Sequence, residues 1–223
     1  MTMATHRKSA RPRDAAATRE VLLDAATLVF AEKGFAGARV DEIAARARAN
    51  KALIYAYYGD KRGLYRAVLS SRFGEFADPS FAEAFAAELS PRRALEEIVR
   101  RFFRLLIKDR RFSRLLPWDL LSNGRSGRDV ILDSSGPLLQ LISELVRRGR
   151  AAGELRATTD PELFRSTLVS LGLGYPLQHS VMTLAREKSG LHYTDEHFVD
   201  YACRILLEPD NLKPENALER RTA

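Results

Sequence analysis

Apolar residues recur every three or four positions along most of the chain, which is the period of an amphipathic helix. We find no segment with the strict alternation of apolar and polar residues that indicates a half-buried strand. The first helix covers about residues 21–33, because Gly34 is a natural helix stop. The pattern as a whole predicts an all-α protein.

Three short helices with recognisable starts follow the first one. A helix over residues 40–47 is separated by only three residues from a helix over 51–57, for which Asn50 is a good N-cap. Asp60 can cap the next helix, which begins at Lys61. Two helices joined by so short a turn make a helix-turn-helix, whose second helix can enter the major groove of DNA.

Longer helices fill the remainder of the chain after a break at residues 78–80. The segment Gly172–Pro176 is unusual within one of them, because Gly lets another chain segment approach closely and Pro removes a helical hydrogen bond. Two interpretations stay open: a kink that makes room for a ligand, or a plain break between two helices. These predicted helices cover about residues 90–109, 138–153, 160–176 and 194–208, and a short segment interrupted by Pro117 covers about 115–121.

Basic residues are concentrated in the first third of the chain. The 223 residues carry a formal net charge of +7. Residues 1–74 hold 14 Lys and Arg against 7 Asp and Glu, an excess of +7 that equals the charge of the whole chain. This asymmetry indicates that the first part of the chain meets a polyanion such as nucleic acid, although a basic solvated surface would have the same composition.

Other features of the sequence argue against several classes of protein. No apolar run reaches the ~18 residues of a membrane span, and the first residues lack the apolar core of a signal peptide, so we expect a cytoplasmic protein. A single cysteine, Cys203, excludes a disulfide framework and a zinc ribbon. We find no phosphate-binding glycine loop, no Gly-x-Ser-x-Gly elbow and no His-Glu-x-x-His helix, and we therefore expect no enzyme, no cofactor and no metal.

Three motifs at fixed spacing lie near the N-terminus, TREVLLDAA at 18–26, FAEKGF at 30–35 and VDEIAARA at 40–47. They are followed by Lys51, Ile54, Tyr55, Tyr58, Asp60, Lys61 and Leu64. Together these residues resemble the DNA-binding domain of the tetracycline-repressor (TetR) family. The resemblance covers roughly residues 15–66, and beyond it only the helix order and RRGRAAGELR at 147–156 are similar.

The resemblance implies a ligand-responsive transcription factor that binds a palindromic DNA operator as a homodimer, usually as a repressor that a small molecule releases. Arg48 stands where the family usually has Gly, and Tyr57 stands where it often has His. If φ is positive at Arg48, the arginine costs of the order of 1 kcal/mol relative to Gly. We expect sequence specificity to depend on Arg39, Lys51 and DNA shape. The residues implied to contact DNA are Arg39, Arg48, Lys51, Ala52, Leu53, Tyr55, Tyr57 and Lys61.

The resemblance also implies that the C-terminal part binds a small-molecule effector and dimerises through its last two helices. For each residue below, a place in the core of the domain itself is an open alternative. The candidate effector residues, which mix aromatic and polar side chains, are Arg101, Phe102, Leu105, Trp118, Leu121, Asn123, Tyr175, His179 and Met182. The candidate dimer residues are Leu163, Phe164, Thr167, Leu171, Phe198, Tyr201, Ala202 and Ile205.

These inferences divide the chain into four parts. We expect a basic arm over 1–13, a helix-turn-helix DNA-binding domain over 14–60, a helical effector and dimerisation domain over 61–207 and a polar tail over 208–223. An activator or a ligand-independent regulator with the same fold stays open. A helical protein-interaction module would also explain the helices. It would not explain why the excess of basic residues in the first third of the chain coincides with the helix-turn-helix.

Overall fold

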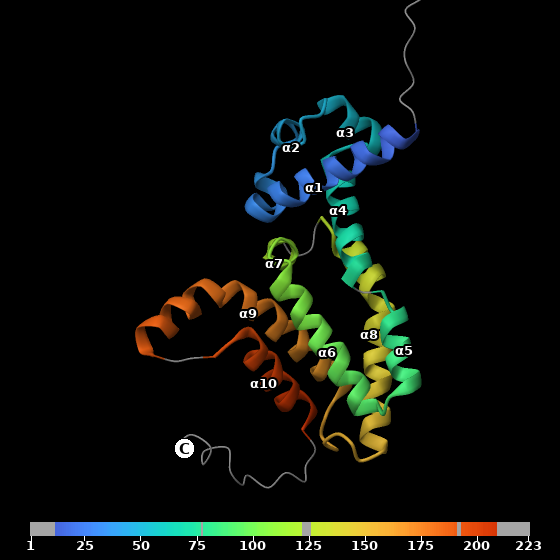
Figure 1. Cartoon of the computed structure of the whole chain (residues 1–223). Coiled ribbons are helices and arrows are strands. Elements are labelled where there is room, and N and C mark those ends of the chain that lie inside the picture. Colours follow the sequence, from blue (N-terminus) through green and yellow to red (C-terminus); the bar gives the residue numbers. More distant parts are fainter. Residues whose placement is uncertain (1–11, 77, 122–125, 191–192, 209–223) are drawn as a thin grey trace, which may run out of the picture. The chain divides into compact units, whose positions relative to one another are not determined.

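The computed structural model describes residues 12–76, 78–121, 126–190 and 193–208. Every regular element in these residues is a helix, which confirms the predicted all-α class (Figure 1). The helices are α1 (Pro12–Gly37), α2 (Val40–Arg46), α3 (Lys51–Tyr58), α4 (Lys61–Phe76), α5 (Ser80–Glu88), α6 (Pro91–Lys108), α7 (Phe112–Leu121), α8 (Arg128–Ala151), α9 (Pro161–Ser189) and α10 (Asp195–Leu207).

Local sequence signals set the ends of several helices where they were predicted. Asn50 caps α3, because its Oδ1 accepts a hydrogen bond from the backbone N of Ala52 at 2.8 Å. Asp60 plays the same part for α4 and accepts from the backbone N of Gly63 at 2.7 Å. Gly34 interrupts α1 with a φ of 67°, a left-handed value that glycine adopts at little cost.

Helix α5 was not predicted, because Asp78 and Pro79 were interpreted as a break. They form a helix start instead, since Oδ1 of Asp78 accepts from the backbone N of Ser80 at 3.0 Å and from its hydroxyl at 2.7 Å. The helix that follows is rich in alanine, and its apolar spacing rests on Phe81 and Phe85 alone. An apolar pattern of only two residues gives a weak helix signal in the sequence.

Helix α9 continues through Pro176 to Ser189, so the plain break between two helices was wrong. Gly172 has a packing role in this helix. A Cβ atom at Gly172 would lie 2.1 Å from the ring of Phe102, so only a glycine lets α9 approach α6 this closely. The kink that makes room for a ligand stays a prediction.

The contacts divide the chain into two compact units, and unit 1 contains the helix-turn-helix. Of the described residues it holds 12–71 and those between Arg114 and Val130. Its aromatic centre consists of Phe30, Phe35 and Tyr65, with ring centroids 4.9 Å apart for Phe30–Tyr65 and 5.2 Å for Phe35–Tyr65. Part of α4 therefore packs with the helix-turn-helix, whereas the domain limit at residue 60 stays a prediction.

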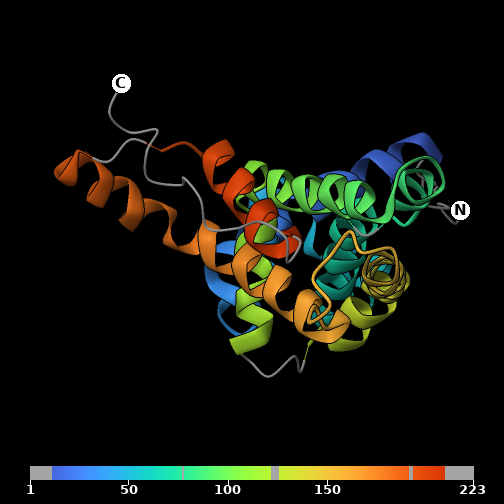
Figure 2. The ribbon, with the colours of Figure 1, turned by 90° about the horizontal axis from the view of Figure 1, so that it is seen from below.

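Unit 2 holds the described residues within 72–113 and 131–208, and α6 lies at its centre. This helix packs against α5, α9 and α10, and Figure 2 shows it beside α10. Pro91 stands at the first turn of α6, where its missing N–H costs nothing. The buried stripe of α6 consists of Ala94, Leu95, Ile98, Val99, Phe103 and Leu106.

Candidate nucleic-acid interface

Helix α3 has one face against the core of unit 1 and one face in solvent. Ile54 is fully buried, and the Tyr58 hydroxyl donates to the backbone oxygen of Arg19 at 3.0 Å. The opposite face presents Lys51, Ala52 and Tyr55, all of them exposed. A helix that contacts base edges in the major groove of DNA, here called the reading helix, needs this arrangement. Its buried face fixes its orientation while the other face meets the groove.

The turn between α2 and α3 contains a strained residue. Arg48 has a φ of 51° and is the one non-glycine residue with a positive φ in the part of the chain that the structure describes. This confirms the positive φ that was considered from the sequence. Arginine in the left-handed region costs roughly 1–2 kcal/mol, because its Cβ crowds the following carbonyl. The Arg48 side chain is exposed.

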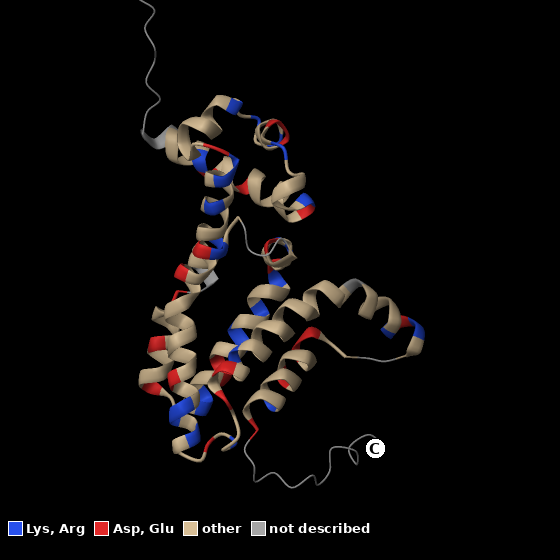
Figure 3. Cartoon of the chain, turned by 180° about the vertical axis from the view of Figure 1, so that it is seen from behind, with Lys and Arg blue, Asp and Glu red and all other residues tan. Residues whose placement is uncertain are grey.

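Three ion pairs hold basic side chains of this region, whose charges are marked in Figure 3. Two of them join α1 to α2 and do not involve the reading helix: Arg46 to Glu32 at 2.8 Å, and Lys33 to Glu42 at 2.8 Å. The third joins α3 to α2, between Nζ of Lys51 and Oδ1 of Asp41 at 2.6 Å. Asp41 is not among the residues predicted from the sequence, because a pair between two helices leaves no periodic signal.

Other basic residues of the interface differ in how freely they can reach a ligand. Within the described residues, no ion pair or hydrogen bond of the Arg39 and Arg48 side chains is found, and both are exposed. Lys61 is held in place, since its Nζ donates to the backbone oxygen of Ala36 at 3.3 Å and lies 4.7 Å from the ring centroid of Phe35. Burial lowers the pKa of Lys61.

The predicted DNA-contact residues therefore fall into three groups. Arg39, Arg48 and the α3 face of Lys51, Ala52 and Tyr55 are exposed. Leu53 and Tyr57 are half-buried, and the guanidinium of Arg19 lies 4.8 Å from the ring centroid of Tyr57. Lys61 is hydrogen-bonded to the backbone oxygen of Ala36. The contact of each residue with DNA stays a prediction.

Helix α7 and the start of α8 also pack in unit 1. Nε1 of Trp118 donates to the backbone oxygen of Ala31 at 3.2 Å, and a Cβ at Gly34 would lie 2.9 Å from the indole ring. The Tyr65 hydroxyl donates to Oδ1 of Asp119 at 3.4 Å, and burial raises the pKa of this carboxyl. Trp118, a predicted effector residue, thus lies against α1.

The other predicted effector residues outside α9 have different surroundings, and their place in an effector site stays a prediction. Arg101 and Leu105 line a groove of about 320 Å³ on α6, while Phe102 packs against the core of unit 2. Leu121 is 79% exposed at the end of α7. Asn123 lies outside the described residues.

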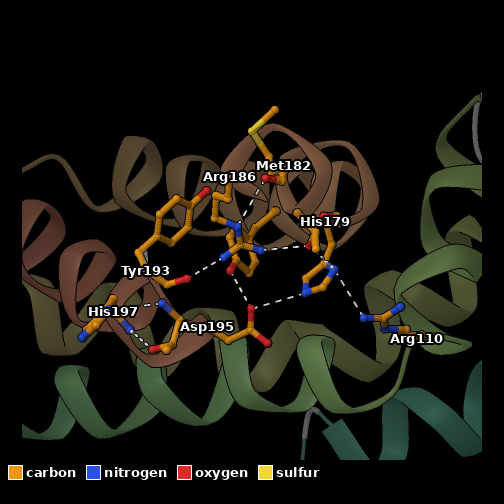
Figure 4. A network of polar contacts seen from close by, with 10 residues as sticks. Arg110, His179, Met182, Arg186, Tyr193, Asp195 and His197 are labelled. Atoms are coloured by element: carbon orange, nitrogen blue, oxygen red, sulfur yellow. Dashed lines mark hydrogen bonds and ion pairs between the residues drawn. The ribbon is translucent and has the colours of Figure 1, made fainter. Parts of the chain in front are cut away.

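The remaining predicted effector residues lie in a polar network on α9 (Figure 4). The Tyr175 hydroxyl donates to Oδ1 of Asp195 at 2.6 Å, and Nε2 of His179 lies 3.5 Å from the same oxygen. Arg110 approaches Nδ1 of His179 at 3.3 Å, and the backbone oxygen of Met182 accepts a hydrogen bond from an arginine of the same helix. The network joins α9 to the first turn of α10.

The sequence of each part matches a described family. Residues 22–68 match the bacterial regulatory proteins of the tetR family, and residues 91–189 match the tetracyclin repressor-like C-terminal domain. These two matches cover more than half of the chain. The chain belongs to the TetR family. Its matching domains are those of transcriptional regulators that bind DNA through a helix-turn-helix, and not of enzymes.

Individual relatives in the TetR family agree with this assignment. The chain is 52% identical over 65 residues to the HTH-type transcriptional repressor SCO4008 of Streptomyces coelicolor, a match that covers 29% of this chain and only 34% of that repressor. It is 30% identical over 156 residues to the HTH-type transcriptional regulator RutR of Escherichia coli, covering 68% of this chain and 70% of RutR.

Solved structures of transcriptional regulators share the fold. The transcriptional regulator FadR of Bacillus subtilis in complex with stearoyl-CoA has a TM-score of 0.64 and 19% identity, over 85% of this chain and 97% of that one. Among the described residues, no helix is long and apolar enough to cross a membrane. Within the same residues, no group of three His, Cys, Asp or Glu side chains could hold a metal ion.

Proposed function

We propose that the protein is a repressor that binds a palindromic operator as a homodimer and is released by a small-molecule effector. The observation that carries this proposal is the exposed face of α3, flanked by the unpaired guanidinium groups of Arg39 and Arg48. The name of SCO4008, a transcriptional repressor, supports repression rather than activation. We further propose that it acts in the bacterial cytoplasm, where its DNA is.

The proposed DNA contacts follow from residue chemistry. Arg39 stands at the N-cap of α2 and Arg48 in the turn, so both can reach phosphate oxygens or the acceptors of guanine. Ala52 and the ring of Tyr55 can contact thymine methyl groups or sugar, since neither places a charge in the groove. Strain at Arg48 supports a functional role for this residue, because glycine would be cheaper there.

A stripe of exposed apolar side chains supports the proposed dimer. Leu163, Leu177 and Val181 follow one face of α9, at separations of 14 and 4 residues, and are 67%, 52% and 64% exposed. Tyr201 and Ile205 lie one turn apart on α10 and are 54% and 40% exposed. Exposed apolar patches of this kind mark protein interfaces. Thr167, Leu171 and Phe198 belong to the proposal, whereas Phe164 and Ala202 are buried in the core of the chain itself and are left out.

The proposed response to an effector uses the helices shared by the two units. Helices α4, α7 and α8 each contribute residues to both units. An effector that binds unit 2 and displaces α7 would act on the contacts of Trp118 with Ala31 and Gly34. A coupling of about 1–3 kcal/mol gives a 5–150-fold change in operator affinity. The bound stearoyl-CoA in the FadR structure supports effector binding by this fold.

Selection of DNA fragments tests the proposal. The purified protein is incubated with sheared DNA from its own genome, and the bound fragments are recovered and sequenced. We expect enrichment of a palindrome whose half-sites lie about one helical turn apart, because two reading helices of a C₂ dimer have this spacing. Compounds suggested by the neighbouring genes are then tested for release of the protein from that fragment.

The proposal has three outcomes that would overturn parts of it. Binding without sequence preference, which disappears between about 50 and 200 mM salt, would leave only the electrostatic contribution and refute an operator. A monomer at the concentrations that bind the operator would refute the homodimer. A compound that binds unit 2 and leaves operator affinity unchanged would refute the effector mechanism for that compound.

A further inference from the structure

The ammonium group of Lys51, at the start of the reading helix, already has an anionic partner. Its Nζ lies 2.6 Å from Oδ1 of Asp41, and the two side chains are 44% and 73% exposed. The hydrogen bond to Asp41 raises the pKa of Lys51. A phosphate or base that approaches Lys51 must therefore share it with Asp41 or displace Asp41.

This pair differs from the other two ion pairs of the helix-turn-helix. Arg46 and Lys33 pair with Glu32 and Glu42 across the α1–α2 contact. Among the described residues, Asp41 is the acid in an ion pair with a residue of α3. Its carboxylate consequently stands beside the surface that is proposed to meet DNA.

We propose that Asp41 is a specificity-determining residue that acts through Lys51 and lowers the affinity of the protein for DNA of arbitrary sequence. The proposal rests on the proposed DNA-binding function and adds to it a residue that discriminates against DNA of the wrong sequence. Asp41 is a positioning residue, because it is not proposed to touch DNA itself.

The physical reason lies in the difference between phosphate and base contacts. Phosphate contacts give affinity for any sequence, and each one steepens the salt dependence of binding by about 0.9 in the slope of log K against log salt. A lysine held by a carboxylate contributes less of this non-specific attraction. An ammonium has three N–H donors, so Lys51 can keep Asp41 and still donate to a base acceptor in the correct site.

A simpler explanation of Asp41 is the dipole of α2, which favours acids in the first turn of the helix. Glu42 shares that turn and carries the same charge, but its partner is Lys33 on α1. Glu42→Gln is therefore a matched control, because it removes the same charge from the same helix turn and leaves the Lys51 pair intact.

The experiment measures binding of the full-length protein by fluorescence anisotropy. The two probes are a labelled mixed-sequence duplex about three helical turns long and the genomic fragment enriched by the selection above. The variants are Asp41→Asn, Glu42→Gln, Lys51→Gln and the double variant Asp41→Asn/Lys51→Gln, each checked for folding by circular dichroism.

We expect Asp41→Asn to tighten binding to the mixed-sequence duplex and to steepen its salt slope by about 0.9, which makes the gain about 3–4-fold larger at 50 mM than at 200 mM salt. The preference for the enriched fragment should fall, because the affinity for that fragment rises less than the affinity for the mixed-sequence duplex. Glu42→Gln should leave the slope unchanged. The double variant should bind both probes as Lys51→Gln does, because Asp41 acts only through the ammonium group of Lys51, which both variants lack.

Three results would overturn the inference. They are an unchanged slope in Asp41→Asn, an equal effect of Glu42→Gln, or a double variant that still binds more tightly than Lys51→Gln. If the wild-type protein itself shows no preference for any fragment, the proposed function fails and the inference fails with it. If the wild type has a preference and Asp41→Asn keeps it in full, only the inference fails.

Discussion

Replacement of Arg48 by glycine should make the protein more stable and a weaker DNA binder. Arg48 is held at a φ of 51°, where a side chain with a Cβ costs roughly 1–2 kcal/mol. Glycine has more freedom in the unfolded chain, which offsets about 0.4–1 kcal/mol of that gain. The net expectation is a gain of about 1 kcal/mol, because the relief of strain is the larger effect.

Thermal unfolding followed by circular dichroism checks the first half of this prediction. A gain of about 1 kcal/mol raises Tm by about 4–8 °C for a cooperative unit of 60–100 residues and by about 2–4 °C for one of 150–250 residues. Binding to the enriched operator checks the second half. Loss of a phosphate contact should lower the salt slope by about 0.9, and loss of a guanine contact should cost about 1–3 kcal/mol of discrimination.

Arg48→Lys is the matched control for this experiment, because it keeps the charge and the strained backbone. It should leave Tm unchanged and retain the salt slope. A Tm of Arg48→Gly at or below that of the wild type would show that the turn is not strained. Unchanged operator affinity and slope in Arg48→Gly would remove Arg48 from the DNA interface.

Four further variants or measurements probe other parts of the structure. Gly63→Ala should destabilise the protein by about 1–3 kcal/mol in urea titrations, because the new Cβ would lie 1.9 Å from the backbone oxygen of Tyr58. Burial raises the pKa of Asp119, so the folded state binds this proton more tightly than the unfolded state. The Tm of the wild type should therefore rise relative to that of Asp119→Asn as pH falls from neutral towards the ordinary value of 3.8. Burial raises the pKa of the Cys203 thiol to about 11, so a thiol reagent at about pH 8 should label it only after unfolding. Val181→Glu should weaken self-association in light scattering, because this side chain is 64% exposed on the proposed dimer stripe.

Each of these has an outcome that contradicts it. A Gly63→Ala protein as stable as the wild type would mean that the turn before α4 shifts at no cost. A constant Tm difference for Asp119→Asn across pH would mean that the carboxyl titrates alike in both states. Fast labelling of Cys203 in the native protein would contradict its burial. Leu132→Glu, which also adds a charge at an exposed leucine on α8, is the control for Val181→Glu, and an equal loss of self-association in both would remove the α9 stripe as its cause.

Much of the helical structure could be read from the sequence, because its signals act over a few residues. Helix period, the caps Asn50 and Asp60 and the stop at Gly34 each depend on contacts within one or two turns of chain. The exposed side of α3 followed from the same period, once Ile54 was assigned to the core. The family resemblance then supplied the function of that side.

Several features that the sequence left open depend on contacts between distant segments. The sequence left a kink and a break at Pro176 open, and the structure shows that α9 continues to Ser189, with Gly172 packed on Phe102, which lies 70 residues earlier in the chain. The predicted effector residues share a chemical character, but the sequence does not show what each of them packs against. Trp118 lies against α1, and Tyr175 lies in the network on α9.

The sequence by itself thus determined most of the helices, the caps Asn50 and Asp60 and the reading helix, since these depend on neighbours three or four positions away. Only the tertiary structure decided that Lys51 is paired with Asp41 while Arg39 and Arg48 are not, and that part of α7 packs with the helix-turn-helix. Those facts depend on which surfaces meet when helices pack. Packing is decided by the fit of whole side-chain surfaces, which no short stretch of sequence contains.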